Sequence, residues 1–397
     1  MTVSQAAPKL RICIATGRYY RNGETFVNRH VTHLFGGNSV VLCGRRTAQD
    51  PLGRPVFSRA RAHLNPVDLL TAPWQLWNNH SRYRAPFVPY GRARARLERF
   101  LRDHVVDVVL AEFGSQAVSV WPLARDMGLP VFAYFRGRDA SRYLRVPSRV
   151  EGYRRMMPEL AGVFSESRFL LDNLAKVGLQ HLNSHVVHSG TDIDAFGPKN
   201  KTIGKILFVG RFVEKKAPLL TLKSFLAIAE KHPHATVHFI GNGPLLSACC
   251  DHARRSRFRD RVMFHGHLAA DKVVNHLADA DILALHSVTG RDGETEGLPV
   301  AIQEAMASGV AVLSTEHAGI PEIIKHNETG VLVKERDAAA MAAALDRMLS
   351  NPEWTRALGT AAREFACSQL DYRQLYARVE AVIRAGAASQ SRSTGAV

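Results

Sequence analysis

The sequence predicts an α/β protein built from two doubly wound domains. Short apolar runs alternate with longer segments of helical pattern, and this alternation recurs in each half of the chain. The runs lack a polar–apolar alternation, which is typical of parallel strands buried on both faces. A length of 397 residues exceeds one ordinary core, and 46% hydrophobic against 22% charged residues is a globular composition.

The predicted strands follow one another along both halves. In the first half they are 11–17, 40–44, 107–113, 130–135, 162–167 and 185–190. In the second half they are 205–211, 236–241, 261–266, 281–287, 310–315 and 330–334. Intervening helices are predicted at 217–232 and 338–350. Since such sheets bind ligands beyond the carboxyl ends of their strands, we expect an active site where the two domains face each other.

The boundary between the domains is predicted near 196–204, where glycine and proline interrupt a polar stretch. This gives an N-terminal domain at 1–197 and a C-terminal domain at 198–370. The tail 387–397 (AASQSRSTGAV) is expected to be disordered.

The segment 66–104 interrupts the strand–helix pattern. It is rich in aromatic residues, including Trp74 and Trp77, and it ends in the basic sequence RARARLERFLR at 92–102. This last part reads as a helix with few apolar positions. One interpretation is a solvated helix, and the other is a surface for anionic lipid or a polyanionic acceptor.

The charge is strongly basic and unevenly distributed. The chain has 52 Lys and Arg against 36 Asp and Glu, a net charge of +16 and a pI near 10.0. Residues 1–200 carry 28 basic and 15 acidic side chains, and residues 201–397 carry 24 and 21. An anionic partner is therefore expected at the N-terminal domain: nucleic acid, anionic lipid or a phosphorylated small molecule.

Cysteine spacing and hydropathy indicate the cellular compartment in which the protein is expected. The five cysteines form no CxxC pair and no metal-binding spacing, which favours reduced thiols in a cytosol. The N-terminal stretch lacks the apolar segment of a secretory signal, and no run of about 18 apolar residues occurs. We expect a cytoplasmic protein, with peripheral contact at the inner face of the plasma membrane.

The most specific motif is RDGETEGLPVAIQEAMASG at 291–309. Pro299 suits the first turn of a helix and Gly309 the position after its end. Glu296 and Glu304 flank the helix start, roughly 12 Å apart for a helical rise. Unpaired amides at a helix start bind phosphate, so the motif suits a diphosphate with hydroxyl-bearing groups on both sides, as in a nucleotide sugar. The alternative is a capping acid and an exposed acid.

Two further strand ends are candidates for the same ligand. The loop within VGRFVEKKAP at 209–218 carries Arg211, Lys215 and Lys216, which can hold phosphate at the carboxyl end of a strand. The sequence FIGNGP at 239–244 runs a strand into a glycine turn. Dinucleotide-binding and Walker-type glycine motifs are absent, which argues against a dehydrogenase or a P-loop NTPase.

These motifs resemble the retaining glycosyltransferases of the GT-B, family-4 type (glycosyltransferase group 1). The resemblance covers nearly the whole second half, through GRFVEKK, GNGP and EGLPVAIQEAMASGVAVLSTEHAGIPEII. It is looser in the first half, through GETFV, DVVLAEFG, YFRGRDAS and HSGTDIDAF. It implies the GT-B fold: two doubly wound Rossmann-like domains facing across a cleft, the first for the acceptor and the second for a nucleotide-sugar donor. It also implies that 371–386 packs back on the first domain.

The resemblance implies roles for individual residues. Arg211 and Lys216 would hold the donor diphosphate, and Glu296 would lie beside the donor sugar ring. Glu304 would accept hydrogen bonds from the ribose hydroxyls. Backbone and small contacts to the donor would come from Gly23, Gly243, Gly297, Leu298 and Val300.

The first half departs from the family pattern at two charged positions. Arg136 stands where the F-H-G-x-D turn has histidine, and Glu112 stands where the H-A-H-F-G strand has its second histidine. With Arg138 and Asp139, these residues form a candidate acceptor site. One interpretation is that they bind an acidic or phosphorylated acceptor. The other is that they form a structural ion pair.

No metal and no cofactor are expected. The triplets Asp192–Asp194 and Asp279–Asp281 match the DxD pattern of metal-dependent glycosyltransferases, but such short matches arise by chance. With Arg211 and Lys216 available for the phosphates, neither triplet is assigned a metal. His265 and His267 are expected to line the nucleotide-base side of the cleft or to pack locally, and not to bind a metal.

The sequence therefore predicts a retaining, metal-independent hexosyltransferase. It would move a sugar from a UDP- or GDP-linked donor to a lipid-linked or oligosaccharide acceptor, in surface polysaccharide or glycolipid biosynthesis. An anionic membrane surface is a further expected partner, and nucleic acid is not. The alternatives are a basic nucleic-acid-binding protein and a nucleotide-sugar epimerase on the same fold.

Overall fold

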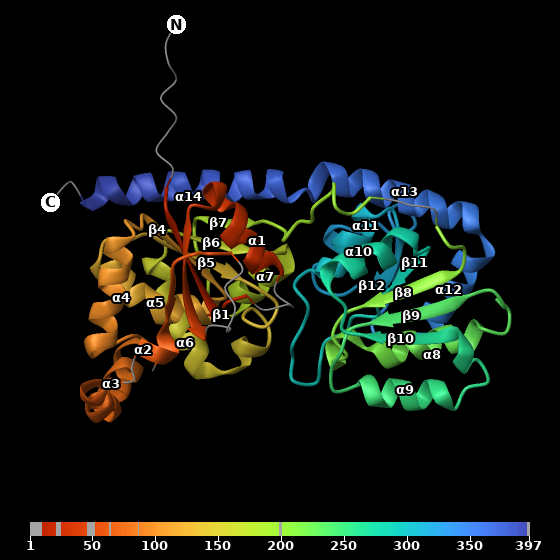
Figure 1. Cartoon of the computed structure of the whole chain (residues 1–397), viewed down its shortest axis with the longest axis horizontal. Helices are drawn as coiled ribbons and strands as arrows, with labels where there is room; N and C mark the ends of the chain where they lie inside the picture. The colour runs from red at the N-terminus through yellow and green to blue at the C-terminus, as the bar shows by residue number, and fades with distance from the viewer. Residues whose placement is uncertain are drawn as a thin grey trace, which may run out of the picture. The chain divides into compact units, whose positions relative to one another are not determined.

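The computed structural model describes residues 10–20, 25–45, 52–62, 65–85, 87–197 and 201–394. The chain forms two units (Figure 1). Unit 1 comprises the described residues of Met1–Glu166, Leu170–Val187 and Tyr376–Val397, and unit 2 comprises those of Ser167–Phe169 and His188–Leu375. Each is a doubly wound α/β unit, which confirms the predicted fold class.

Unit 1 contains a seven-stranded parallel sheet in the order β3-β2-β1-β4-β5-β6-β7. Its strands are Ile12–Arg18 (β1), Ser39–Arg45 (β2), Val56–Ser58 (β3), Val108–Glu112 (β4), Val131–Phe135 (β5), Gly162–Ser165 (β6) and Ser184–Val186 (β7). Its helices are Thr25–His33 (α1), Arg59–Ala62 (α2), Pro66–Tyr83 (α3), Gly91–Asp103 (α4), Gly114–Asp126 (α5), Pro147–Met156 (α6) and, from Leu170 on, Arg168–Lys176 (α7).

Unit 2 contains a six-stranded parallel sheet in the order β10-β9-β8-β11-β12-β13. Its strands are Lys205–Val209 (β8), Thr236–Ile240 (β9), Val262–Gly266 (β10), Ile282–Ala284 (β11), Ala311–Thr315 (β12) and Val331–Val333 (β13). Its helices are Pro218–Ile228 (α8), Leu246–Arg254 (α9), Ala270–Asp279 (α10), Val300–Ala307 (α11), Ala338–Ser350 (α12) and Pro352–Gln369 (α13). The last helix, Tyr372–Thr394 (α14), begins in unit 2 and continues in unit 1.

The central strands form because apolar side chains can be buried on both faces of a parallel sheet. Every residue of β4 and of β5 is buried, and the first five residues of β1 are buried too. Each predicted strand overlaps an observed one. Strand β3 has no predicted counterpart, because three half-buried residues at a sheet edge leave no apolar run.

The basic segment at 92–102 lies within α4, a solvated helix with one buried stripe. Ala93, Leu97 and Leu101 are buried at a spacing of four residues, so one face packs on unit 1 while most arginines point outward. The buried Asp68 carboxylate of α3 accepts from the amides of Arg92 and Ala93, both at 2.9 Å, and so caps the helix.

The predicted boundary at 197/198 is wrong, because the units divide between Val187 and His188. Backbone contacts tie the segment after His188 to unit 2. The Thr191 amide donates to the Leu370 carbonyl at 2.8 Å, and the Tyr372 amide donates to the Thr191 carbonyl at 3.1 Å. Glycine and proline at 196–204 mark turns of the chain. The boundary between the units lies earlier, because these long-range hydrogen bonds attach the residues after His188 to unit 2.

Helix α14 supports one expectation about the C-terminal segment and corrects another. Its residues from Tyr376 on belong to unit 1, as expected for 371–386, and Glu380 accepts from the Phe35 amide at 2.7 Å. The expected disorder is wrong for 387–394, which continue α14 to Thr394. Alanines after Arg384 favour helix at this end of the chain. None of the described helices is long and apolar enough to cross a membrane.

Candidate functional site

Charged side chains meet in unit 2 beyond the carboxyl ends of β8 and β11, where the strand order reverses. After β8 the chain forms a short 3-10 helix, Glu214–Lys216, and after β11 a loop leads to α11. Doubly wound sheets bind ligands at such a reversal, because the connections diverge to opposite faces and open a crevice. The donor-side residues predicted from the sequence therefore lie where the topology favours a ligand.

Lys215 and Lys216 converge on the carboxylates of the loop. The Lys216 ammonium lies 3.4 Å from Glu296 Oε2, and the Lys215 ammonium lies 3.6 Å from Glu296 Oε1. Lys215 also lies 2.9 Å from Glu294 Oε1 and donates to the Thr295 carbonyl at 3.2 Å. These two lysines and two glutamates are called the lysine–glutamate cluster below.

Glu296 is almost fully buried within this cluster and is ionised. Burial raises the pKa of its carboxyl group, but the ammonium groups of Lys215 and Lys216 outweigh burial and lower the pKa to about 2. Burial lowers the pKa of Lys216, against the opposing effect of Glu296. A carboxylate of such low pKa accepts hydrogen bonds well but is a weak base.

His317 holds the backbone of Glu296 in place. The Glu296 amide donates to His317 Nε2 at 3.1 Å, and His317 Nδ1 lies 2.6 Å from Glu335 Oε1. The carboxylate favours the tautomer with the proton on Nδ1, which leaves Nε2 as the acceptor. Neither His317 nor Glu335 is among the site residues predicted from the sequence. They follow β12 and β13, and their position just after neighbouring strands is the signal that could have found them.

The other predicted donor residues surround the same strand ends. Arg211 follows β8, is exposed, and makes no ion pair within the described part of the chain. Gly243 follows β9 with φ 155°, and a Cβ there would lie 2.6 Å from the Phe212 carbonyl oxygen. Only glycine lets this turn approach the Arg211 loop so closely. Gly23 lies outside the described residues.

The start of α11 is anchored by its neighbours. The Gly297 carbonyl accepts from the Gly319 amide at 3.0 Å, Leu298 is buried, and Val300 begins the helix. The first amides of a helix lack partners within it and carry positive partial charge. Glu304 lies half-buried further along α11. The structure thus brings Lys216 and Glu296 into contact, with the helix start next to Glu296 in the chain.

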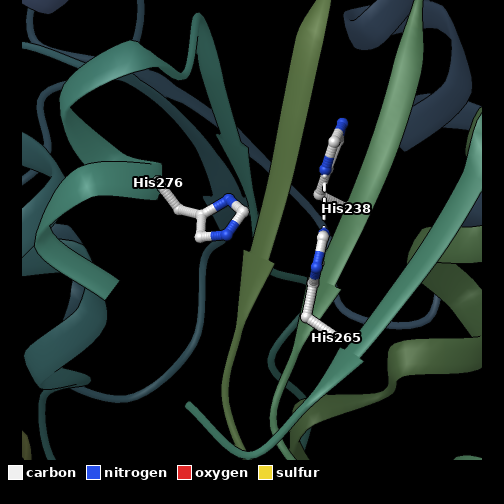
Figure 2. A group of neighbouring side chains, drawn as sticks. All are labelled: His238, His265 and His276. Carbon is white, nitrogen blue, oxygen red and sulfur yellow. Dashed lines mark hydrogen bonds between the residues drawn. The ribbon is translucent and has the colours of Figure 1, made fainter. Parts of the chain in front are cut away.

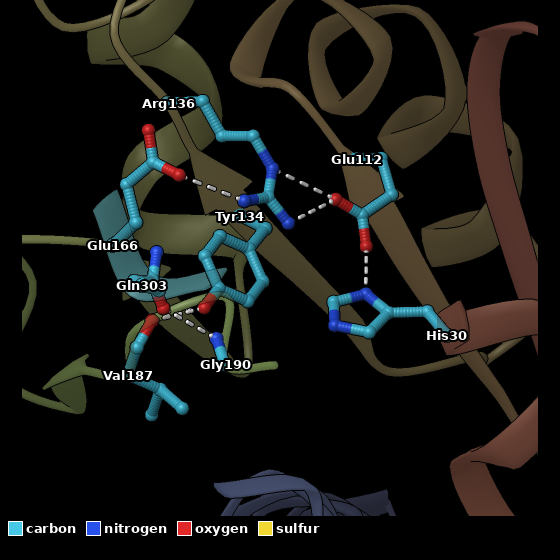
Figure 3. A network of polar contacts seen from close by, with 8 residues as sticks. All are labelled: His30, Glu112, Tyr134, Arg136, Glu166, Val187, Gly190 and Gln303. Atoms are coloured by element: carbon cyan, nitrogen blue, oxygen red, sulfur yellow. Dashed lines mark hydrogen bonds and ion pairs between the residues drawn. The ribbon is translucent and has the colours of Figure 1, made fainter. Parts of the chain in front are cut away.

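A second charged cluster is buried in unit 1 (Figure 3). The Arg136 guanidinium lies 2.9 Å from Glu112 and 3.0 Å from Glu166, and Glu112 also contacts His30. Burial raises the pKa of Glu112, but His30 and Arg136 outweigh it and lower the pKa to about 2. Arg136 further stacks on the Phe26 ring at 3.7 Å. Because these charges satisfy one another, the geometry favours the structural ion pair over a site that reads the acceptor.

The side chains of the neighbouring residues Asp139 and Arg138 differ in burial. Asp139 is buried, and its Oδ1 accepts from the Tyr153 hydroxyl at 3.3 Å and from the Ser115 amide at 3.4 Å, near the start of α5. Burial raises the pKa of Asp139 to about 6. Arg138 is exposed. Asp139 therefore has a structural role.

Both DxD triplets have their carboxylates engaged. Asp194 pairs with Arg373 at 2.5 Å, and Asp192 accepts from the Asp194 amide at 3.1 Å. Asp279 pairs with Lys205 at 2.7 Å, and Asp281 accepts from the Gly204 amide at 3.0 Å. These partners give each triplet a local structural role.

Unit 1 has a cavity of about 690 Å³ at its own strand-order reversal. It lies beyond the ends of β1 and β2 and beside the first turns of α5. Its basic lining is Arg18, Arg45, Arg59 and Arg149. None of the four makes an ion pair with a residue that the structure describes. Arg59 donates to Ser119 and Gln116, while its Nε is buried without a partner there. The cavity is therefore positive and suits an anionic ligand.

Apolar side chains adjoin this cavity. Leu76 and Phe87 line it, and Phe87 is 79% exposed. On α3, Val67, Leu70, Trp74 and Trp77 form a stripe spaced for one helix face, and all four are exposed. An exposed apolar stripe of this kind marks a surface for a membrane or another partner. We call Val67, Leu70, Trp74 and Trp77 the α3 stripe.

The comparisons with known proteins place the chain in a family. A family model described as "Glycosyl transferases group 1" matches residues 191–365. The glycogen synthase of Mycobacterium tuberculosis is 30% identical over 382 residues, which cover 87% of this chain and 87% of that protein. The chain belongs to the group 1 glycosyltransferases. The matched segment contains the lysine–glutamate cluster, Arg211 and Glu304, whereas the unit 1 cavity lies outside it.

Other similar glycosyltransferases either have a lower sequence identity or match a shorter part of this chain. The amylovoran biosynthesis glycosyltransferase AmsK of Erwinia amylovora is 32% identical over 54% of this chain. The chain spans only 54–61% of the length of AmsK and two relatives of comparable identity. A GDP-mannose-dependent α-(1-6)-phosphatidylinositol monomannoside mannosyltransferase of Mycobacterium tuberculosis is 26% identical, over 73% of this chain and 78% of its own length.

The solved structures confirm the fold of this group 1 glycosyltransferase. Anabaena Alr3699/HepE, in complex with UDP, matches with a TM-score of 0.76 at 14% identity, over 95% of this chain and 100% of that one. The predicted GT-B fold is thereby confirmed.

Proposed function

We propose that the chain is a retaining hexosyltransferase that takes a sugar from a UDP- or GDP-linked donor to a lipid-linked or oligosaccharide acceptor. The observation that carries this proposal is the lysine–glutamate cluster at the strand-order reversal of unit 2, with Arg211 beside it. Ammonium and guanidinium groups bind a diphosphate, and the Glu296 carboxylate accepts a hydrogen bond from a sugar hydroxyl.

The chemistry follows from what the cluster can and cannot supply. Glu296 has a low pKa and is held by two ammonium groups, so it orients the sugar instead of attacking it. The acceptor hydroxyl then attacks the anomeric carbon on the face from which the diphosphate leaves, and its proton passes to a departing phosphate oxygen. Lys216 and Arg211 stabilise the charge that grows on that phosphate, and no metal or cofactor is needed.

The relatives support either nucleotide. Anabaena Alr3699/HepE binds UDP, and the mycobacterial mannosyltransferase depends on GDP-mannose. The direct test is to incubate the protein with a panel of UDP- and GDP-sugars and to measure release of UDP or GDP. Release from at least one donor is expected. No release and no binding of either nucleotide would refute the proposal.

Replacing Glu304 with alanine should weaken binding of the free nucleotide roughly ten- to hundredfold, because hydrogen bonds from the ribose to a charged acceptor are lost. Calorimetry with UDP and GDP measures this, with Glu364→Ala, an exposed acid on α13, as the matched control. Unchanged affinity in the Glu304 variant would remove this residue from the donor site.

The acceptor is proposed to be an anionic amphiphile, as a phosphate-linked lipid intermediate would be. The unit 1 cavity supplies four arginines without described ion pairs, and a bound phosphate or carboxylate would neutralise them. Leu76 and Phe87 beside these arginines suit the apolar part of such a molecule. The biosynthesis of a surface polysaccharide or glycolipid uses acceptors of this chemistry.

Arg59→Met is expected to raise the acceptor KM roughly tenfold or more, since hydrogen bonds to a charged group are lost, and to leave UDP and GDP affinity unchanged. Steady-state kinetics with varied acceptor measures it once the donor is known. The control is Arg154→Met, an exposed arginine of α6 that pairs with Glu151 and does not line the cavity. Equal KM values in both variants would exclude the cavity as the acceptor site.

We also propose that the chain works as a peripheral protein at the inner face of the plasma membrane. The α3 stripe supplies apolar side chains, and Arg92, Arg96 and Arg99 on the adjacent α4 are exposed. Apolar insertion and attraction to anionic headgroups then act together.

Binding to vesicles that contain anionic lipid should fall about tenfold or more in Trp74→Ala/Trp77→Ala, because insertion of two indole rings is lost. This loss should persist at high salt. Arg96→Ala/Arg99→Ala should instead remove part of the salt-sensitive binding. Co-sedimentation at two ionic strengths separates the two effects. Binding that depends on neither pair of residues would show that this surface does not meet the membrane.

A further inference from the structure

Three histidines outside the donor-side cluster converge in unit 2 (Figure 2). They are His238 of β9, His265 of β10 and His276 of α10. One ligand nitrogen from each lies within 4.8 Å of the other two, and all three side chains are half-buried. No other group of three such ligands occurs among the residues that the structure describes.

The sheet brings the first two histidines together. β9 and β10 are parallel neighbours, with Met263 opposite His238, so His265 lies two residues further on the same face. The register shifts between Phe264 and Gly266, which leaves His265 without an opposite residue. His238 Nδ1 and His265 Nε2 are 3.0 Å apart, and their rings lie within 8° of parallel.

Helix α10 adds the third imidazole in its last turns. The His276 ring centre lies 4.6 Å from that of His265 and 6.1 Å from that of His238. Its Nδ1 is buried and finds no hydrogen-bond partner among the described residues. A buried ring nitrogen without a partner costs free energy unless a ligand satisfies it.

The electrostatic surroundings keep all three rings neutral at physiological pH. Burial and then the Lys205 ammonium lower the pKa of each histidine, and that of His238 falls to about 4. Lys205 itself pairs with Asp279, one turn beyond His276 on α10. The Lys205 ammonium also opposes a bound cation, and the Asp279 carboxylate that pairs with it offsets this charge.

We propose that His238, His265 and His276 form a binding site for a divalent transition-metal ion, with Zn²⁺ as the best fit. A tetrahedral Zn²⁺ with Zn–N bonds of about 2.0–2.1 Å holds its ligand nitrogens roughly 3.3 Å apart. The His238 and His265 nitrogens already lie near this spacing, and the ligand nitrogens of all three residues lie within 4.8 Å of one another, so metal binding requires the imidazole rings to turn toward a common point. Three imidazoles leave one position for water, and nitrogen ligands favour Zn²⁺, Co²⁺, Ni²⁺ or Cu²⁺ over Mg²⁺ and Ca²⁺.

Such an ion would cross-link three elements at one edge of the sheet. β10 is the outer strand, β9 is its neighbour, and α10 connects β10 to β11. An ion that binds the folded form stabilises it in proportion to its occupancy. The site shares no residue with the lysine–glutamate cluster and does not depend on the proposed transfer reaction.

The test uses the full chain, freed of metal with EDTA and then of EDTA by dialysis. Titration with Co²⁺ should give the intense visible absorption of a tetrahedral ion at one equivalent, and Zn²⁺ should displace it. His265→Gln and His276→Gln should each weaken Zn²⁺ binding by about 10² or more, since loss of even an outer partner costs 10–100-fold. The matched control is His267→Gln, which removes an exposed histidine two residues from His265.

A second measurement guards against variants that merely misfold. Zn²⁺ should raise the Tm of the parent and of His267→Gln, but not that of the two site variants, whose metal-free Tm should stay near that of the parent. If all variants bind Zn²⁺ equally, or if the Co²⁺ spectrum is the same in the parent and in the two site variants, the three histidines hold no metal. In that case His238 and His265 form only a hydrogen-bonded pair, with the His276 ring beside it.

Discussion

Lys216→Ala is expected to lower kcat by ~10²–10³ and to weaken donor binding much less. Negative charge on the diphosphate grows as the sugar–phosphate bond breaks, so a fixed ammonium group interacts more strongly with the transition state than with the bound donor. Lys216 is buried and held by Glu296, which keeps its charge in place before the reaction. Steady-state kinetics, together with calorimetry of the nucleotide, separates the two effects.

Arg211→Ala should act in the same direction, and transfer should persist in EDTA because these two cations take the place of a metal. The matched control is Lys231→Ala, an exposed lysine of unit 2 that pairs with Asp346. The chelator experiment is best repeated in His276→Gln, so that metal bound at the three histidines cannot affect it. If EDTA abolished turnover while the two cation variants kept parental rates, the diphosphate would be held by a metal and this assignment would be wrong.

The second large effect concerns stability. Arg136→Met should destabilise unit 1 by about 3–5 kcal/mol, because it leaves buried carboxylates without their cation. Glu112 and Glu166 both contact this guanidinium and are almost fully buried. Urea unfolding followed by tryptophan fluorescence, in a Trp354→Phe background, reports on unit 1 through Trp121, which is buried there.

A double variant distinguishes a structural ion pair from an acceptor-binding charge. Glu112→Gln/Arg136→Met removes one charge of each sign and should recover part of the lost stability. At a temperature where both variants are folded, the acceptor KM should match that of the parent. A loss below about 1 kcal/mol in Arg136→Met, or a raised acceptor KM in the folded double variant, would contradict the structural role.

Much of the donor side could be predicted because its residues are close together in the sequence. Glu296, the glycine turn and Glu304 lie within one motif, and Arg211 and Lys216 follow one buried strand. On the acceptor side, the sequence leaves open whether Glu112 and Arg136 bind an acceptor or form a structural ion pair. Their contact, and the presence of Glu166 beside them, depends on β4, β5 and β6 being neighbours in the sheet.

The sequence by itself determined the fold class, every strand except β3, and the residues proposed for the donor side. Those features depend on local periodicity, on glycine and proline, and on side chains placed directly after buried strands. The tertiary structure alone decided which residues far apart in the sequence come together. Examples are Arg59 and the other arginines that line the unit 1 cavity, His317 and Glu296, and the three histidines of unit 2. It also decided the division at Val187 and the helical course of 387–394. The physical reason is that partners far apart in the chain are selected by strand order and helix packing, which no local pattern encodes.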